Sequence, residues 1–160
     1  MSRRLKALAD SIERIGYRVL GGLLAGMSLI IAWQVFQRYV LGVTHAWTEE
    51  AALYAMMWLG LVGAALGLRR GSHIAIAYFT RKLEGAAGRA VAALVWCSEA
   101  LFALFLLVYG WRLSRAFLTE SSPGTGIPAG IIYLALPLGG ALMMLFLVEQ
   151  ASLAWARRRS

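Results

Sequence analysis

The residues of this sequence that could do chemistry are few, and the most conspicuous are carboxylates set against apolar runs. Glu99 lies near the middle of the apolar stretch 90–111, and Glu49 and Glu50 stand side by side directly before the uncharged stretch 51–68. An ionisable group inside a membrane is costly and marks a candidate functional site. Glu99 could carry a proton in a carrier or bind a neighbouring helix in a scaffold. No second ionisable residue lies deep in an apolar stretch to form a proton relay, so we favour the structural role.

The Glu49–Glu50 pair suits the start of a helix. Thr48 is predicted to cap that helix with its hydroxyl oxygen, and Trp47 to anchor the membrane edge. The two carboxylates then lie in the first turn, where the helix dipole stabilises anions. Adjacent helical positions point about 100° apart, so at most one carboxylate can face a given neighbour squarely. Two explanations of the pair stay open. Either both glutamates serve the helix start alone, or one of them also contacts a partner.

The histidines and the single cysteine do not indicate a redox or metal centre. Membrane anchors of redox enzymes hold haem through His side chains, but His45 and His73 fall between apolar stretches, on opposite sides of the predicted membrane. Cys97 lies within an apolar stretch and is interpreted as a small buried hydrophobe. The sequence holds no cluster of metal ligands, no nucleophile paired with a base and no phosphate-binding glycine loop. We therefore predict no catalytic residue, no cofactor in this chain and no enzyme activity.

The elements that must position these residues are membrane helices. Hydrophobic residues make up 60% of the chain and charged residues only 15%, against about 25% charged residues in soluble domains. The mean hydropathy is +0.66, and a soluble protein of 160 residues cannot hide that much apolar surface. Stretches of about 20 apolar residues can cross a bilayer. We predict an all-α integral membrane protein, a single membrane domain over 1–160, with four transmembrane helices at about 19–40, 51–68, 90–111 and 128–148.

The basic residues orient these spans. Of the 16 Lys and Arg residues, 13 lie in the N-terminal segment, between the second and third spans, or at the C-terminus. By the positive-inside rule the N and C termini and the middle segment are cytoplasmic. The net charge of +8 lies in short stretches between spans, so it fits membrane orientation and does not indicate nucleic acid.

Shorter features complete the pattern. Segments 3–15 and 73–86 carry apolar residues at helical spacing, with charged residues such as Asp10 and Glu13 elsewhere around the helix. This pattern predicts interfacial amphipathic helices; a solvated linker is the alternative for 73–86. Pro137 lies inside the fourth span and should bend that helix. Glycines at G-x-x-x-G spacing in the first two spans are interpreted as helix-packing positions: Gly22, Gly26, Gly63 and Gly67.

Three ordered stretches resemble a known family. The first span ends in WQVFQRYVLG, the second lies within WTEEAALYAMMWLGLVGAALGLRRGSHIAI, and the last opens with GIPAGIIYLALPLGGALMML. Together they resemble the small membrane subunit, a four-helix Q-type permease, of tripartite ATP-independent periplasmic (TRAP) transporters, over about residues 19–155. The family's Trp and adjacent Glu pair are matched by Trp47, Glu49 and Glu50, and its Arg and His by Arg69 and His73. Our candidate subunit-contact or structural residues are Trp47, Glu49, Glu50, Arg69, His73, Glu99 and Pro137.

The resemblance implies a role in transport. Such systems import organic acids, such as dicarboxylates or sialic acid-like substrates, and a sodium gradient drives the import. A periplasmic substrate-binding protein delivers the ligand to the membrane subunits. The large multi-span permease subunit carries the substrate and sodium sites and moves as an elevator, and the small subunit braces it. We therefore expect a scaffold subunit in the bacterial inner membrane whose partners are the large permease subunit, the binding protein and membrane lipid. The alternatives are an autonomous small oligomeric carrier built around Glu99 and, less favoured, a redox-enzyme membrane anchor.

Overall fold

The structure, a computed structural model, describes the backbone of residues 2–82 and 86–157 and the side chains of residues 6–70, 87–88 and 90–153. It is almost entirely helical, and the described residues form no strand. The fold class and its four apolar helices, each long enough to span a membrane, are thus confirmed: Lys6–Leu41, Ala46–Arg70, Ala90–Ala116 and Ala129–Leu153. In chain order the elements are α1 (Ser2–Phe36), the π-helical turn η1 (Gln37–Leu41), α2 (Ala46–Lys82), α3 (Ala86–Ala116), α4 (Ala129–Tyr133) and α5 (Ala135–Arg157).

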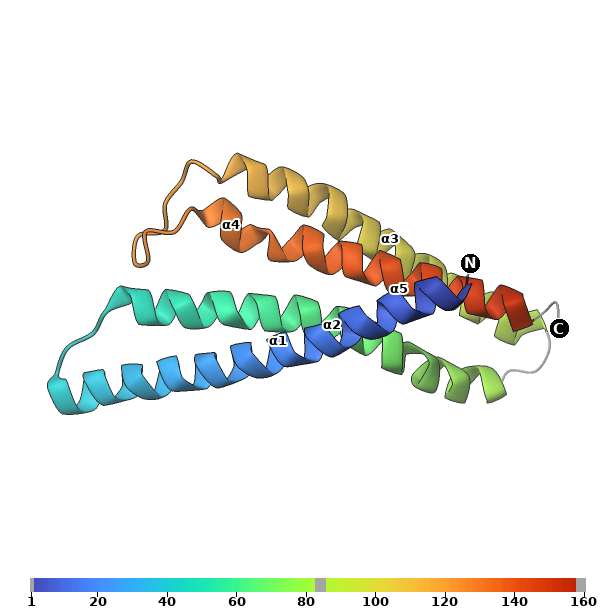
Figure 1. The fold of residues 1–160 in the computed structure, drawn as a ribbon, viewed down its shortest axis with the longest axis horizontal. Coiled ribbons are helices and arrows are strands. Elements are labelled where there is room, and N and C mark those ends of the chain that lie inside the picture. Colours follow the sequence, from blue (N-terminus) through green and yellow to red (C-terminus); the bar gives the residue numbers. More distant parts are fainter. Residues whose placement is uncertain (1, 83–85, 158–160) are drawn as a thin grey trace.

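The helices form two antiparallel hairpins, α1 with α2 and α3 with α4 and α5 (Figure 1). Both termini lie at one end of the bundle, here called the termini end, and the connections 42–45 and 117–128 lie at the opposite, loop end. Helix α5 packs against α1, α2 and α3. It is the central helix, since 44% of the most apolar window of the fourth span is buried, against 0% for the first. That the termini end is cytoplasmic stays a prediction.

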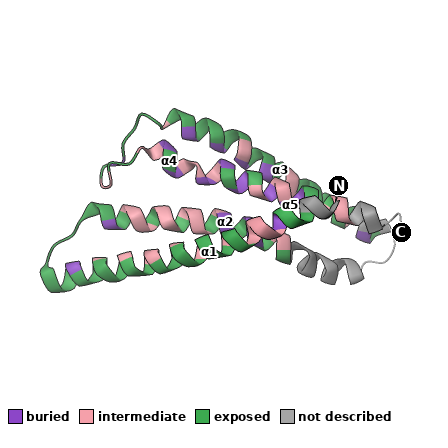
Figure 2. Cartoon of the chain, viewed as in Figure 1, coloured by how far each residue is buried: buried purple, intermediate pink, exposed green. Residues whose placement is uncertain are grey.

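The buried core runs from the middle of the bundle toward the termini end, where the two hairpins meet (Figure 2). Its largest fully buried apolar side chains are Phe146, Leu66 and Leu147. The outer faces of α1 and α3 are exposed, as expected of helices that meet lipid or another subunit. Cys97 lies on the exposed part of α3, so its interpretation as a buried hydrophobe was wrong, because the third span buries only a narrow strip of its surface.

Glycines bring α3 close to α4 and α5. A Cβ atom added to Gly140 would lie 2.7 Å from the Ala103 carbonyl oxygen and 2.7 Å from the Leu107 nitrogen, and Gly110 and Gly130 are equally confined. The prediction of packing positions in the first two spans was therefore wrong within this chain, because G-x-x-x-G spacing does not say which helix face meets a neighbour. An added Cβ would meet no atom within 4 Å at the predicted positions: Gly22, Gly26, Gly63 and Gly67.

The segments predicted as interfacial helices are continuous with the spans. Helix α1 runs from Ser2 to Phe36 without interruption, so segment 3–15 forms its first turns, and Ala9 in that segment is fully buried in the core. The structure therefore corrects the prediction of a separate helix there. Helix α2 likewise continues to Lys82, and the side chains of segment 73–86 lie outside the described residues. The position of both segments at a membrane surface stays a prediction.

The fourth span is interrupted near its start. Helix α4 ends at Tyr133 and α5 begins at Ala135, with Leu134 between them, three positions before Pro137. A proline cannot donate a backbone hydrogen bond to the preceding turn and its ring crowds that turn, so the break lies where Pro137 is expected to produce it. Figure 1 shows the resulting change of direction between α4 and α5.

Candidate functional site

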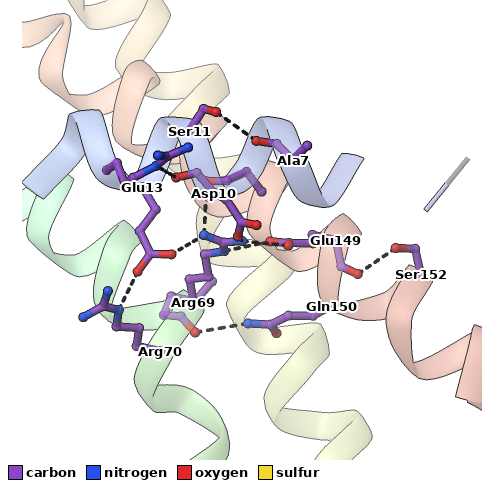
Figure 3. Close-up of polar contacts among 12 residues, drawn as sticks. Ala7, Asp10, Ser11, Glu13, Arg69, Arg70, Glu149, Gln150 and Ser152 are labelled. Carbon is purple, nitrogen blue, oxygen red and sulfur yellow. Dashed lines mark hydrogen bonds and ion pairs between the residues drawn. The ribbon is translucent and has the colours of Figure 1, made fainter. Parts of the chain in front are cut away.

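Arg69 is the centre of an ion-pair cluster at the termini end (Figure 3). Its Nε and Nη2 atoms donate to the two carboxylate oxygens of Glu149, each at 2.8 Å. Its Nη2 also lies 2.5 Å from a carboxylate oxygen of Asp10. Its Nη1 donates to Glu13 and, at 3.1 Å, to the carbonyl oxygen of Ala9. One guanidinium group thus ties α2 to both α1 and α5.

A second arginine extends the cluster toward the surface. Arg70 Nε donates to the other carboxylate oxygen of Glu13, and its guanidinium carbon lies 4.4 Å from the centre of the Tyr17 ring. The side chain of Glu149 is 4% exposed and that of Arg69 10%, whereas that of Arg70 is 66% exposed. Hydrogen bonds between charged groups are strongest where water is excluded, so Arg69 and Glu149 form the central pair. We call the set Asp10, Glu13, Arg69, Arg70 and Glu149 the Arg69 cluster.

The sequence brings these groups together at the ends of three spans. Asp10 and Glu13 are three positions apart and therefore share one face of α1. Arg69 follows the last apolar turn of the second span, and Glu149 follows that of the fourth. Gly16 lets α1 approach α2 closely, since a Cβ atom there would lie 2.9 Å from a leucine methyl carbon of α2. This approach brings both carboxylates of α1 within reach of Arg69.

The geometry of the Arg69 cluster is that of a clamp between helices. Both oxygens of Glu149 and both oxygens of Glu13 accept hydrogen bonds from arginine. Arginine remains protonated in proteins, so the cluster holds a permanent positive charge at its centre. Within the described part of the chain, no three His, Cys, Asp or Glu side chains are arranged to hold a metal ion. Because Arg69 of α2 is paired with carboxylates of both α1 and α5, the cluster can fix these three helices relative to one another.

Glu50 makes a corresponding contact at the loop end. Its carboxylate accepts hydrogen bonds from the backbone N–H groups of Gly124 and Thr125, both at 3.0 Å, and from the hydroxyl groups of Ser122 and Tyr54. A Cβ atom on Gly124 would lie 2.8 Å from the Glu50 carboxyl carbon, so the loop backbone can approach only because that position is glycine. This Glu50 contact joins the start of α2 to the connection between α3 and α4.

The connection that meets Glu50 is itself folded. The Ser122 N–H donates to the Ile127 carbonyl oxygen at 2.9 Å, and the Gly126 N–H donates back to the Ser122 carbonyl oxygen at 2.9 Å. Gly126 adopts a left-handed backbone conformation with φ of 69°, which glycine accepts without strain. The Ser122 hydroxyl also lies 2.5 Å from the Tyr54 hydroxyl. The donors that Glu50 meets therefore belong to a connection that also forms hydrogen bonds of its own.

The two adjacent glutamates point in different directions, as their positions on a helix require. Glu50 turns to the connection, whereas Glu49 is exposed in the first turn of α2, where the helix dipole supports its charge. Trp47 is exposed as well. Thr48 is fully buried, and its hydroxyl donates to a backbone carbonyl oxygen at 2.8 Å. Its prediction as an N-cap acceptor was wrong, because α2 begins two residues before it.

The other predicted positions are dispersed over the bundle. Glu99 is half-buried in α3, and Pro137 is buried in α5, where it lies close to Gly110. His45 is exposed in the connection 42–45. His73 belongs to α2, and its side chain lies outside the described residues. The structure thus builds two separate polar contacts, at opposite ends of the bundle, around Arg69 and Glu50.

The carboxylates that surround Arg69 were not predicted from the sequence. On sequence alone Asp10 and Glu13 belong to the polar side of a surface helix, and Glu149 has no assigned role. A signal was nonetheless present in the pattern. Arg69 and Glu149 carry opposite charges, each directly follows a span, and the two spans run in the same direction, so both residues reach the same side of the bundle.

Comparison with known proteins finds one matching family model and several similar proteins, and their descriptions agree with one another. Residues 27–157 match the family model described as tripartite ATP-independent periplasmic transporters, DctQ component. The chain is 26% identical over 146 residues to the sialic acid TRAP transporter small permease protein SiaQ of Vibrio cholerae, covering 91% of this chain and 84% of that protein. It is 29% identical over 118 residues to the C4-dicarboxylate TRAP transporter small permease protein DctQ of Rhodobacter capsulatus, covering 72% of this chain and 52% of that protein. The family match includes Glu50, Arg69 and Glu149, and it begins after Asp10 and Glu13.

Proposed function

This chain belongs to the DctQ component family of tripartite ATP-independent periplasmic transporters, and on that premise we propose that it is the scaffold that braces the large permease subunit. Its relatives are small permease proteins of membrane transporters, so the chain is a multi-pass transporter subunit and not an enzyme. In our proposal the large subunit holds the substrate and sodium sites and moves during transport. The small subunit holds the stationary part of the large one in place.

The observation that carries this proposal is the use of ionisable groups for internal contacts. The Arg69 cluster joins α1, α2 and α5 at the termini end, and the Glu50 contact joins α2 to the α3–α4 connection at the loop end. The two hairpins are therefore tied together at both ends. A carrier needs polar or broken-helix elements that bind a solute near the midplane. Here the core cluster between the helices is built from apolar side chains such as Phe146 and Leu66, and the interruption of the fourth span lies near its start.

The exterior of the bundle supports the same proposal. The most apolar window of the first span is 0% buried within this chain, and α1 exposes large apolar side chains such as Leu24, Leu29 and Trp33. Helix α3 is similarly exposed, with Leu94 and Leu101 at its surface. A rigid bundle with extensive apolar faces suits contact with lipid and with a larger membrane subunit.

We further propose that the transporter carries an organic acid together with sodium across a bacterial inner membrane. One relative is named for sialic acid and another for C4-dicarboxylates, which supports an organic acid as the substrate class. The distribution of basic residues favours cytoplasmic termini. In that orientation the connection held by Glu50 faces the periplasm, where a substrate-binding protein would approach.

The experiment that tests the proposal separates a scaffold from a carrier. Proteoliposomes with a sodium gradient would contain this chain alone, the large permease alone, or both, each with the binding protein and with labelled sialic acid or a C4-dicarboxylate outside. We expect uptake only when both membrane subunits are present, and recovery of the large permease with this chain after gentle detergent extraction. Uptake by this chain alone that is abolished by Glu99→Gln would overturn the proposal in favour of an autonomous carrier.

A further inference from the structure

A cavity opens on the side of α3, next to the bend in the fourth span. It is a shallow, open cavity of about 470 Å³, and its wall is almost wholly apolar. The bend shapes it, since Gly110 of α3 lies directly against Leu136 and Pro137, and Leu136 lines the cavity from α5. The main side chains that α3 contributes are Phe105, Tyr109, Arg112, Leu113 and Ala116.

The polar group at this cavity is the guanidinium of Arg112, which lies against an aromatic ring of the wall. The rings of Phe105 and Tyr109 lie 4.6 Å apart along the wall, and the guanidinium carbon of Arg112 lies 5.7 Å from the centre of the Tyr109 ring. Arg115 follows one turn later, and both arginines are exposed. Neither forms an ion pair with any residue that the structure describes. Arg112 therefore places an uncompensated positive charge at one end of an apolar cavity, and Arg115 lies nearby without lining it.

The polarity of the cavity is ordered along the helix. From Phe105 to Ala116 the wall extends about 16 Å at about 1.5 Å per residue, roughly half of the ~30 Å hydrocarbon thickness of a bilayer. Arg112 lies in the last turns of α3, beside the exposed Trp111, and tryptophan is typical of the membrane–water interface. The charged end of the cavity is thus at the membrane edge and the apolar end at mid-depth, which is the order of groups in one phospholipid.

We infer that this cavity binds an anionic phospholipid, with an acyl chain along Phe105 and Tyr109 and the phosphate at Arg112. Arginine recognises phosphate by charge and by its fork of donors, and a headgroup with one net negative charge would balance the charge of Arg112. A transmembrane helix of another subunit could fill the apolar part, but its apolar side chains would leave Arg112 without an anion. The charges therefore favour lipid as the occupant.

The test uses the full chain, delipidated in detergent and mixed with equal amounts of phosphatidylglycerol and phosphatidylethanolamine of identical acyl chains. Native mass spectrometry would measure which lipid stays bound. We expect phosphatidylglycerol to be retained about fivefold better, as one arginine near a membrane surface provides, and Arg112→Gln to remove this preference. Arg38→Gln is the matched control, because Arg38 is an exposed cation at the same end, in η1, and does not line the cavity.

A second variant tests the apolar part of the cavity. Ala116→Phe places a ring in the cavity from an exposed position and should lower the retention of both lipids, with an unchanged helical circular dichroism spectrum as the check on folding. Equal retention of the two lipids by the unaltered chain, or an equal loss of preference in Arg38→Gln, would overturn the inference. So would a photo-reactive residue at Leu113 that, in the assembled transporter, crosslinks to the large permease and not to lipid.

Discussion

Arg69 and Glu149 are 80 positions apart in the chain and meet through two hydrogen bonds, each 2.8 Å long. Such two-point contacts fix orientation as well as distance. The guanidinium carbon of Arg69 also lies 5.4 Å from the centre of the Phe146 ring, a fully buried core residue. The pair therefore belongs to the packed interior, and it sets how α2 lies against α5.

Replacement of Glu149 by Gln should destabilise the bundle. The substitution keeps the size of the side chain but leaves Arg69 facing a neutral group at a site that is nearly closed to water. Removal of one partner from a buried ion pair is strongly destabilising, and because Asp10 and Glu13 still contact Arg69, we expect a loss of about 2–3 kcal/mol in unfolding free energy. Denaturant unfolding in detergent micelles would measure it.

The control for Glu149→Gln is Arg70→Gln, which changes the exposed arginine next to Arg69 in the same cluster. Arg70 shares Glu13 with Arg69, but its side chain is 66% exposed, and exposed ion pairs contribute about 0–1 kcal/mol. Arg70→Gln should therefore change the unfolding free energy by less than about 1 kcal/mol. Similar losses in the two variants would show that burial of the Arg69–Glu149 pair has no energetic consequence.

Replacement of Glu50 by Gln should release the connection between α3 and α4. A carboxamide presents an NH₂ group where the carboxylate accepts hydrogen bonds from Ser122 and from the Gly124 and Thr125 backbone. Hydrogen–deuterium exchange should become about tenfold faster at those two amides, since hydrogen bonds to charged acceptors are the stronger class. Glu49→Gln changes the exposed member of the pair and should leave exchange at 124 and 125 unaltered. Equal acceleration in both variants would contradict the assignment of the contact to Glu50.

The number of helices and the bend in the fourth span follow from the sequence because their causes are local. The length of an apolar stretch is set by bilayer thickness, and Pro137 disturbs the turn that precedes it wherever the helix lies. The Arg69 cluster has no local cause. It depends on which face α1 turns to α2, and on α5 lying beside both, so the pattern around Asp10 and Glu13 indicates a surface helix equally well.

The glycines illustrate the same limit at single positions. The first span carries the G-x-x-x-G spacing at Gly22 and Gly26, yet a side chain added there would meet open space. Gly110 and Gly140 lack that spacing with respect to each other, yet they lie where two backbones touch. Close packing is a property of the pair of faces in contact, and a single helix sequence holds only one of the two faces.

Replacement of Gly140 by Ala should separate α3 from α5. The new methyl group would lie 2.7 Å from backbone atoms of Ala103 and Leu107, which cannot move aside as a flexible side chain can. Overpacking of this kind costs about 1–3 kcal/mol, so the midpoint of thermal unfolding in detergent should fall. Gly22→Ala is the control: its methyl group meets no atom, and alanine is about 0.5–1 kcal/mol better than glycine inside a helix. A lower midpoint for Gly22→Ala than for Gly140→Ala would contradict the packing described here.

Replacement of Glu99 distinguishes a structural carboxyl group from one that must titrate. Glu99 is half-buried in the third span, and Gln preserves its shape and its capacity for hydrogen bonding, whereas Lys places a cation within the apolar part of a helix at considerable cost. In the transporter reconstituted with its large subunit and binding protein, Glu99→Gln should keep most of the sodium-driven uptake, and Glu99→Lys should lose it together with assembly. The measurements are uptake rate and recovery of the large permease. If Glu99→Gln assembles normally but does not transport, protonation of Glu99 is part of the transport cycle, and the scaffold role is incomplete.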